Sequence, residues 1–339
     1  MQPLLDWYDA GHRDLPWRTL PTPYRVWVSE IMLQQTRVEA VRGYFARWME
    51  ALPDIPALAA ADEAVYTKLW EGLGYYSRVR NLHRAAVLLC EQYGGALPAD
   101  YDKLLSLPGV GEYTAGAVAS IAFGLPVPAV DGNVLRVAAR LGSDFTPITD
   151  TKFKKQTRER FAALMPTDRP GDLNQALMEL GATVCVPNGA PHCGDCPIQH
   201  LCEGFHRGNA AVLPLRAAKK ARRTENRTVL LVRCGELVGL RQRPKKGLLA
   251  GLWELPSLDG HLTPDELRAA LTEMGWSVRK LLSLRPAKHI FTHVEWHMNG
   301  VYVELDEPAP ALTFVTPAAL RADYALPSAF RSFVSVLED

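Results

Sequence analysis

Apolar residues recur at three- and four-residue spacing through the first part of the chain. The pattern is clearest over residues 24–49 and 62–93, where Pro and Gly interrupt it. This spacing places apolar side chains along one face of a helix. Alternating, strand-like patterns are not evident before residue 206. We therefore predict an all-α domain over residues 1–205.

The pattern changes after residue 227. Strand-like runs follow at TVLLVR (228–233), ELVGLRQR (236–243), HIFTHVEWHM (289–298) and NGVYVEL (299–305). Gly, Pro and an Asn-Gly pair, which is typical of a turn, separate them. GLLAGLWELP (247–256) is expected to form a loop and a strand in the core. The sequence thus predicts an α+β domain over residues 228–339, joined to the first by a linker at 206–227.

Composition fits this division. A chain of 339 residues with 47% apolar content can bury two cores of ordinary size. No apolar run approaches the roughly 20 residues of a membrane helix, and the N-terminal segment shows no targeting pattern, so we expect a cytoplasmic protein without a membrane role. The net charge is only +1, but residues 206–227 hold seven Lys or Arg against one Glu. Such a run is typical of a solvated linker.

Four cysteines lie at spacings of seven, two and five intervening residues: Cys185, Cys193, Cys196 and Cys202. Thiolates this close in sequence can bind one metal centre, and without a His in the register an iron-sulfur cluster or a four-cysteine zinc is expected. Two disulfides are the alternative, disfavoured by only six cysteines in the chain. Cys90 and Cys234 are expected to be core thiols.

A Leu-Pro-Gly-Val-Gly turn lies within residues 104–123, between two predicted helices. The backbone amides of Gly109, Val110 and Gly111 are expected to be free to bind a phosphate of a nucleic-acid backbone. Pro-Gly also ends many ordinary helices, so a purely structural turn is the alternative. Downstream, Asp131 precedes another predicted helix and by itself suggests an N-cap.

Together these features resemble the base-excision DNA glycosylases of the endonuclease III superfamily, and more narrowly the MutY-type adenine DNA glycosylases. The resemblance is carried by DLPWR (14–18), PYRVWVSEIMLQQTRVEAV (23–41), GLGYYSRVRNLH (72–83), LPGVGEYTAGAV (107–118), VDGNVLRV (130–137) and NQALMELGATVC (174–185). It implies a monomeric, nucleoid-associated enzyme that hydrolyses the N-glycosidic bond of adenine in double-stranded DNA with A:8-oxoG or A:G mispairs. It also implies a 4Fe-4S cluster on the four cysteines. The first cysteine interval is one residue longer than the family's, and we expect the longer loop to close on the cluster.

The chemistry needs two carboxyl groups, because adenine leaves easily only after a proton reaches its ring, and the departing sugar is cation-like. Glu30 lies among apolar neighbours such as Val28 and Ile31, which should raise its pKa, and it matches the family's catalytic acid. Asp131 should stay ionised through hydrogen bonds and the helix dipole, and it matches the aspartate that stabilises the sugar cation. Glu39, on the same helical segment, is expected to face solvent.

Tyr113 occupies the position at which bifunctional members of the superfamily carry a Schiff-base lysine. A phenol cannot form that bond, so the resemblance implies a monofunctional glycosylase. Tyr113 and Asn133 are expected to orient the sugar and the attacking water. A structural role for Tyr113, capping the hairpin helix, is the alternative.

Removing a base from the stack leaves a gap that a side chain usually fills. By resemblance, the residues that enter the duplex are Gln35 and Tyr75. Those lining the adenine pocket are Arg18, Trp17, Leu33 and Gln175, with core packing as the alternative for Trp17 and Leu33. Those expected to contact phosphates are Arg78, Arg80 and Lys103.

The second domain resembles the Nudix fold with a degraded hydrolase motif. Ala269 and Thr272 stand where metal-binding glutamates would be needed, so we expect a binding module instead of a pyrophosphate hydrolase. Its Thr292 and His293 are expected to contact 8-oxoguanine. His289, His293 and His297 are expected on one face of a single strand, at a spacing too wide for a metal site by themselves.

Two other functions remain open from the sequence. One is a bifunctional glycosylase with lyase activity, against which Tyr113 counts. The other is a non-enzymatic, metal-stabilised DNA-binding protein, in which Glu30 and Asp131 would be dispensable surface charges.

Overall fold

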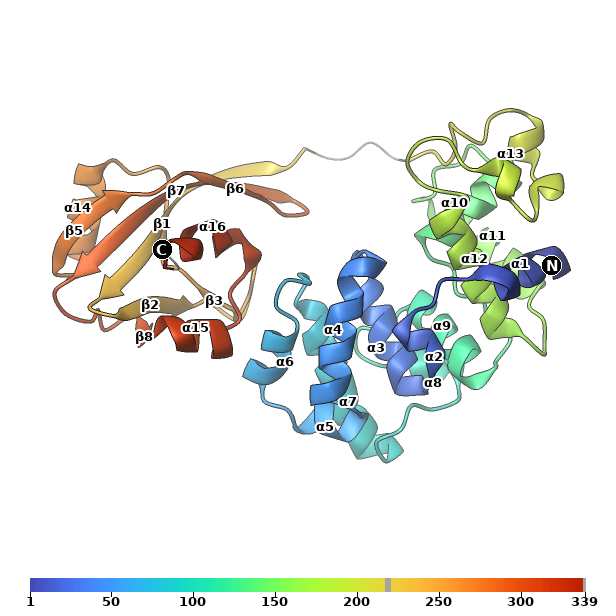
Figure 1. Cartoon of the computed structure of the whole chain (residues 1–339), viewed down its shortest axis with the longest axis horizontal. Helices are drawn as coiled ribbons and strands as arrows, with labels where there is room; N and C mark the ends of the chain where they lie inside the picture. The colour runs from blue at the N-terminus through green and yellow to red at the C-terminus, as the bar shows by residue number, and fades with distance from the viewer. Residues whose placement is uncertain (217–220, 338–339) are drawn as a thin grey trace. The chain divides into compact units, whose positions relative to one another are not determined.

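The computed structural model describes residues 1–216 and 221–337, which form two compact units. The first unit combines residues 1–61 with the chain from residue 77 to the linker, and is helical (Figure 1). The second combines residues 62–76 with the chain after the linker, and is built on a sheet (Figure 1). In the part of the chain described, no helix is long and apolar enough to cross a membrane.

The first unit confirms the predicted helical pattern. Its α-helices are α1 (Gln2–Gly11), α2 (Pro16–Thr19), α3 (Pro23–Leu33), α4 (Val38–Ala51), α5 (Ile55–Ala60), α7 (Ser77–Tyr93), α8 (Tyr101–Leu105), α9 (Glu112–Phe123), α10 (Gly132–Leu141), α11 (Thr151–Ala162), α12 (Pro170–Thr183) and α13 (Glu203–His206). Polar N-cap side chains start several of them by accepting a backbone N–H, as Thr22 does for α3 and Asp131 for α10. Trp27, Trp48 and Phe45 are fully buried between them.

Helices α8 and α9 flank the predicted hairpin turn. Gly109 has a φ of +77°, and a Cβ there would lie 2.5 Å from the Cβ of Asn81 on α7. Only glycine meets both demands. The N–H of Val110 donates to the carbonyl of Leu107 (3.1 Å). The expectation that this amide is free for a phosphate is therefore wrong, because the turn itself uses it.

The second unit has α6 (Glu63–Leu69), α14 (Pro264–Glu273), α15 (Pro317–Asp323) and α16 (Arg331–Val334) around an eight-stranded mixed sheet. Its strands are β1 (Arg223–Cys234), β2 (Leu237–Gln242), β3 (Trp253–Glu254), β4 (Ser257–Asp259), β5 (Val278–Ser283), β6 (Ala287–Ile290), β7 (Val294–Leu305) and β8 (Thr313–Val315). The main path runs β3-β2-β1-β7-β5, with β1 and β7 parallel.

Alternating side chains of β1 build a core on each face of the sheet. Val229 and Leu231 pack with Phe330 at the chain's end, whereas Leu230 and Val232 pack with Leu267 of α14. Figure 1 shows α14 on one side of the sheet and α15 and α16 on the other. The predicted α+β domain is thus confirmed. Strand β1 begins at Arg223, so it includes the last residues of the segment expected to be linker, and residues 217–220 lie outside the described chain.

The predicted Asn-Gly turn is wrong, because Asn299 and Gly300 lie inside β7. A Cβ on Gly300 would be 2.4 Å from Cε1 of Phe333, so this glycine admits an aromatic ring from the chain's end and does not form a turn. The chain reverses earlier, between β6 and β7. His289 and His297 consequently lie on neighbouring strands and not on one.

Candidate functional site

A cavity of about 500 Å³ opens between the helices of the first unit. Segments far apart in the sequence form it, chiefly α3 and the turn after it, the start of α9 and α10, and one face of α12. The predicted residues that line it are Trp17, Arg18, Glu30, Leu33, Gln35, Tyr113, Asp131, Asn133 and Gln175. Trp17 also packs edge-on against Phe45, so it is both a core residue and a pocket wall.

Glu30 is the buried acid of this cavity. It is only 6% exposed on α3, and Tyr113 Oη donates a hydrogen bond to its Oε2. Burial raises the pKa of Glu30 and the bond from Tyr113 lowers it, while the charge of Asp131 raises it and that of Arg18 lowers it; together they bring the pKa to about 7. A carboxyl group with this pKa can hold a proton near neutral pH and release it. Glu39 is exposed as expected, but it lies on α4 and not on the helix that carries Glu30.

Asp131 faces the same cavity from the N-terminus of α10. Its Oδ1 accepts from Val134 N (2.8 Å) and its Oδ2 from Asn133 Nδ2 (2.7 Å), so it is the predicted N-cap. Burial nonetheless raises the pKa of Asp131, although these bonds lower it. This direction does not contradict the expectation that Asp131 stays ionised, which remains a prediction. The two hydrogen bonds favour Asp131 over Glu30 as the ionised member, because the Glu30 carboxyl accepts, among the described residues, only from a phenol.

Tyr113 has no capping role, since Gly111 is the N-cap of α9. Its hydroxyl bonds Glu30 and lies 3.5 Å from Sδ of Met178. Burial raises the pKa of Tyr113 well above its usual value, and the charge of Glu30 adds to this. The phenol therefore stays neutral and acts as a donor.

Glu179 on α12 is a cavity residue that sequence reasoning missed. It is 2% exposed, and it accepts from Arg13 Nε (2.7 Å) and from Arg18 Nη2 (2.9 Å). Burial raises the pKa of Glu179, but the two arginines outweigh it and hold the pKa below the ordinary value. Its partners lie more than 160 positions away, so no local pattern could reveal the pair.

Two arginines of α10, also missed, connect the cavity to the cysteines. Arg136 Nη2 donates to Asn133 Oδ1 (2.9 Å) and its Nε to the carbonyl of Cys185 (2.8 Å). One turn later, Arg140 Nη1 donates to Cys185 Sγ (3.2 Å). Both arginines are buried. Helix α10, whose N-cap is Asp131, is therefore hydrogen-bonded through its later residues to Cys185 at the start of the cysteine loop.

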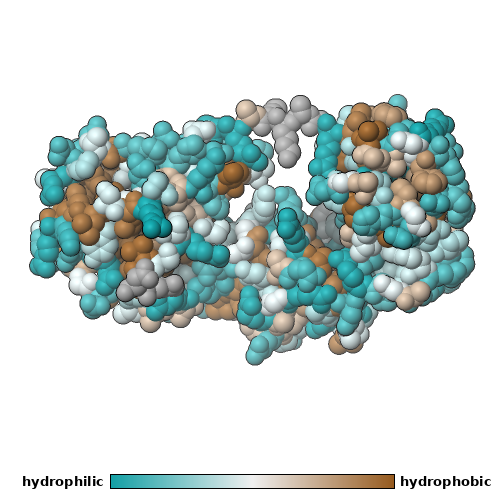
Figure 2. Space-filling view, turned by 45° about the horizontal axis from the view of Figure 1, so that its top comes forward, coloured by the Kyte–Doolittle hydropathy of each residue, from teal (hydrophilic) through white to brown (hydrophobic). Residues whose placement is uncertain are grey.

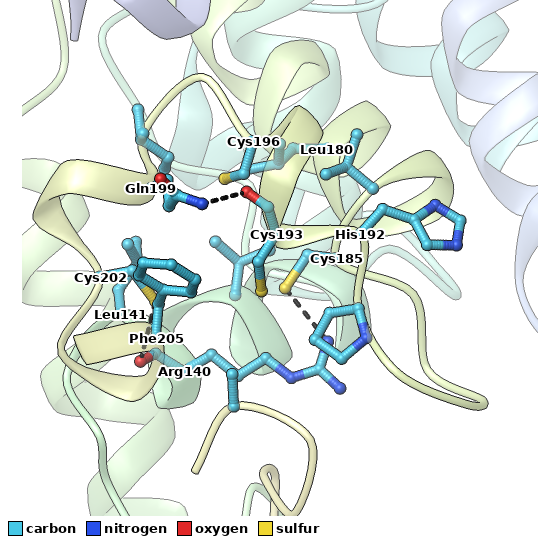
Figure 3. Close-up of a pocket in the computed structure, with 15 residues that line it drawn as sticks. Arg140, Leu141, Leu180, Cys185, His192, Cys193, Cys196, Gln199, Cys202 and Phe205 are labelled. Carbon is cyan, nitrogen blue, oxygen red and sulfur yellow. Dashed lines mark hydrogen bonds between the residues drawn. The ribbon is translucent and has the colours of Figure 1, made fainter. Parts of the chain in front are cut away.

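The four predicted cysteines line a second, apolar cavity, walled by residues such as Val137, Leu180 and Ile198. Figure 3 shows their side chains around this space, with Arg140 beside Cys185. All four are free thiols, so the disulfide alternative is wrong. The loop of the longer first interval closes on itself, because the His192 N–H donates to the carbonyl of Val184 (2.9 Å); its closure on a cluster stays a prediction.

The arrangement of the thiols bears on the metal they could hold. Within the described residues, no three His, Cys, Asp or Glu side chains form a group that could hold a metal ion. A tetrahedral zinc needs four donors converging on one point. In a cubane each iron takes its own thiolate, so the sulfurs surround the group. Thiols lining a common apolar cavity fit the cluster better than zinc.

Arg78 differs from its prediction. It is 9% exposed, and its Nη1 donates to the carbonyls of Ile31 (2.8 Å), Met32 (3.0 Å) and Gln34 (2.6 Å). The expectation of a phosphate contact is wrong, because this guanidinium is committed to the C-terminus of α3. The phosphate contacts of Arg80 and Lys103 stay predictions.

The remaining predicted residues belong to the second unit. Thr292 and His293 are exposed in the turn between β6 and β7. The hydroxyl of Tyr75 lies 2.9 Å from Thr292 Oγ1, and Tyr75 has a φ of +46°. The structure therefore brings two of the residues predicted to meet the opposite base together. In α14, Ala269 and Thr272 leave the hydrolase motif without the acids it needs.

Hydrophilic residues cover most of the face that Figure 2 draws. On the face drawn in Figure 2, hydrophobic residues form small, separate patches.

Comparisons with known proteins agree with this architecture. A family model described as "HhH-GPD superfamily base excision DNA repair protein" matches residues 28–165, and a NUDIX domain model matches residues 228–336. Among solved structures, a thermostable thymine-DNA glycosylase is similar with a TM-score of 0.54 and 27% identity, over 61% of this chain and 94% of that one. Endonuclease III in a non-covalent DNA complex is similar with a TM-score of 0.52 and 26% identity, again over 61% of this chain and 94% of that one.

Relatives align along nearly the whole chain. The adenine DNA glycosylase of Mus musculus is 40% identical over 91% of this chain and 71% of its own length. The adenine DNA glycosylase of Homo sapiens is 36% identical over 93% of this chain and 68% of its own length. The chain therefore belongs to the family of adenine DNA glycosylases, base-excision repair enzymes that combine a helix-hairpin-helix domain with a Nudix domain.

Proposed function

We propose that this enzyme removes adenine paired with 8-oxoguanine or guanine by hydrolysis, without cleaving the strand. The observation that carries the proposal is the pairing of Glu30, with a pKa of about 7, and Asp131 in one buried cavity. A proton donor and a carboxylate on one site are what departure of a base from a sugar requires.

In the proposed mechanism Glu30 gives its proton to a ring nitrogen of adenine. The N-glycosidic bond then breaks, its electron pair leaves with the base, and the sugar becomes cation-like. The carboxylate of Asp131, held by Val134 N–H and the Asn133 amide, stabilises that cation. Water adds to the sugar and returns a proton to Glu30. Tyr113 keeps Glu30 oriented throughout.

The absence of strand cleavage follows from Tyr113. A lyase step needs an amine that forms a Schiff base with the opened sugar. The residue that contacts the acid here is a phenol kept neutral by burial. The product of the proposed reaction is therefore an intact strand with an abasic site.

Recognition of the opposite base is assigned to Gln35, Tyr75, Thr292 and His293. Gln35 lines the cavity, and the hydroxyl of Tyr75 lies beside Thr292. Exposed polar groups at a turn can reach the edge of a base. We further propose that the enzyme acts as a monomer on the DNA of the nucleoid.

We assign a 4Fe-4S cluster to Cys185, Cys193, Cys196 and Cys202. Their common apolar cavity and the Arg140 N–H directed at Cys185 Sγ fit that group. When bound, the cluster supplies a cross-link for the loop at 185–202. Base hydrolysis itself needs no electron transfer.

The test is single-turnover incubation with duplex DNA carrying adenine opposite 8-oxoguanine, analysed before and after hot alkali. Strand breaks that appear only after alkali are expected. Breaks without alkali would refute the monofunctional assignment. Thymine opposite guanine is the competing substrate, because a thymine-DNA glycosylase is among the similar structures.

Two variants link the activity to the acid. Glu30→Gln should abolish excision while retaining DNA binding, because an amide cannot donate the proton. Glu39→Gln is the matched control, since Glu39 lies on the neighbouring helix and is exposed. Equal activity of the two variants would remove Glu30 from the mechanism.

A further inference from the structure

The guanidinium of Arg78 occupies the C-terminal end of α3. Besides the carbonyls of Ile31, Met32 and Gln34, it reaches Thr36 Oγ1 at 3.4 Å from Nη2. The last carbonyls of a helix have no partner within it, and the helix dipole makes this end negative. A buried cation with a planar fork of donors satisfies both at once.

The turn that follows α3 is unusual. Gln34 leaves the helix with φ −56° and ψ 111°, and Gln35 then adopts φ +59°. A left-handed conformation at this point is normally given to glycine, and costs another residue about 1 kcal/mol or more. Such a conformation persists only where neighbouring groups hold it. The bond from Arg78 to the carbonyl of Gln34 lies directly before it.

This turn belongs to the adenine pocket. Leu33, Gln34, Gln35 and Thr36 all line the cavity that contains Glu30. The direction of the Gln35 side chain is set by its backbone, which has no regular element to support it. Anything that fixes the Gln34 carbonyl therefore also sets where Gln35 points.

We propose that Arg78 is a positioning residue, which acts through the turn at residues 34–36 to hold Gln35 in the pocket. The proposal rests on the proposed function for its activity assay, but not for its stability assay. All three carbonyl contacts are made by Nη1. A lysine ammonium would keep the charge but end one bond short of Nη1 and lack the second nitrogen that reaches Thr36, so it could not bind the same set of acceptors in place.

The first experiment compares Arg78→Lys with Arg84→Lys in single-turnover excision of adenine opposite 8-oxoguanine. Arg84 is the matched control, because it lies on the same helix α7 and is exposed. Arg78→Lys should slow excision roughly tenfold or more, as a displaced contact does. Arg84→Lys should stay within about twofold of the unchanged enzyme, as surface changes usually do. Equal rates for the two variants would overturn the proposal.

A double-mutant cycle with Gln35→Ala shows whether the effect passes through Gln35. In that background Arg78→Lys should slow excision by less than about twofold, because coupled residues are not additive. If the two substitutions instead slow excision independently, so that the fold-changes of the single variants multiply in the double variant, the proposal is overturned. A shifted pH profile in Arg78→Lys would also overturn it, because it would mean that Arg78 acts on the acid and not on the turn.

Stability supplies a test that needs no substrate. Glycine adopts the left-handed conformation without strain, so Arg78→Lys should lower the thermal midpoint less in a Gln35→Gly background than alone. If Arg78→Lys fails to fold, recovery of the fold in the double variant supports the proposal, and no recovery overturns it. If the unchanged enzyme lacks the activity, the proposed function fails, while this comparison still tests Arg78.

Discussion

Tyr113 donates a hydrogen bond to Glu30 although 83 positions of sequence separate them. The bond joins the hairpin helix to the helix that carries the acid, and it opposes the rise that burial causes in the pKa of Glu30. Removing this hydrogen bond should therefore raise the pKa of Glu30.

Tyr113→Phe removes only the hydroxyl. We expect the pKa of Glu30 to rise further, because the bond lowers it. Glu30 acts as an acid, so excision falls as pH rises through its pKa. In Tyr113→Phe that fall should come at higher pH, which a single-turnover pH-rate profile would measure. An unchanged profile would show that the hydroxyl does not act on the acid.

Glu30→Gln should stabilise the protein at alkaline pH. The folded pKa of about 7 lies above the ordinary glutamate value of 4.5. The folded state therefore prefers protonated Glu30, and its stability falls as pH rises between these values. The full penalty above pH 7 is about 3 kcal/mol. The thermal midpoint of Glu30→Gln should exceed that of the unchanged protein at pH 8 and approach it at pH 4; a lower midpoint at pH 8 would contradict this.

Glu179→Ala should destabilise the first unit. It leaves Arg13 and Arg18 without the carboxylate they share, and loss of one member of a buried ion pair typically costs about 3–5 kcal/mol. Glu159→Ala is the control, because its pair with Lys155 is exposed and 3.9 Å long. Thermal unfolding of both variants measures the difference, and equal midpoints would show that the Glu179 pairs contribute little.

Gly300→Ala should destabilise the second unit, because the new methyl group would lie 2.4 Å from the Phe333 ring. Overpacking of this kind costs about 1–3 kcal/mol. Asn299→Ala in the same strand β7 is the control and adds no such contact. Pairing Gly300→Ala with Phe333→Leu should restore part of the loss in thermal unfolding. Without that recovery, the contact would not explain the glycine.

The purified protein should contain about four irons per chain and the matching sulfide. Cys193→Ser should lower the iron content, because it removes one thiolate from the cavity. Cys90→Ser should leave it unchanged, since Cys90 does not line that cavity. Elemental analysis measures both. Stoichiometric zinc in place of iron would refute the cluster assignment.

The fold was largely readable from local signals. Helical periodicity, with caps such as Thr22 and Asp131, defines the first unit, and alternating residues define β1. The Asn-Gly pair at 299–300 misled because turn propensity is local. The reason for Gly300 is Phe333, which lies more than 30 positions away and packs against it only in the folded domain.

The amino-acid sequence by itself determined which chemical groups are present: an acid in an apolar helix, a phenol in place of a lysine, and four clustered thiols. Only the tertiary structure decided how those groups behave. Burial raises the pKa of Asp131 despite its capping bonds. The fold also brings Glu179 next to two arginines that are distant in sequence, and it directs Arg78 to backbone carbonyls instead of phosphates. Each of these depends on desolvation and on partners remote in sequence, which residue patterns do not encode.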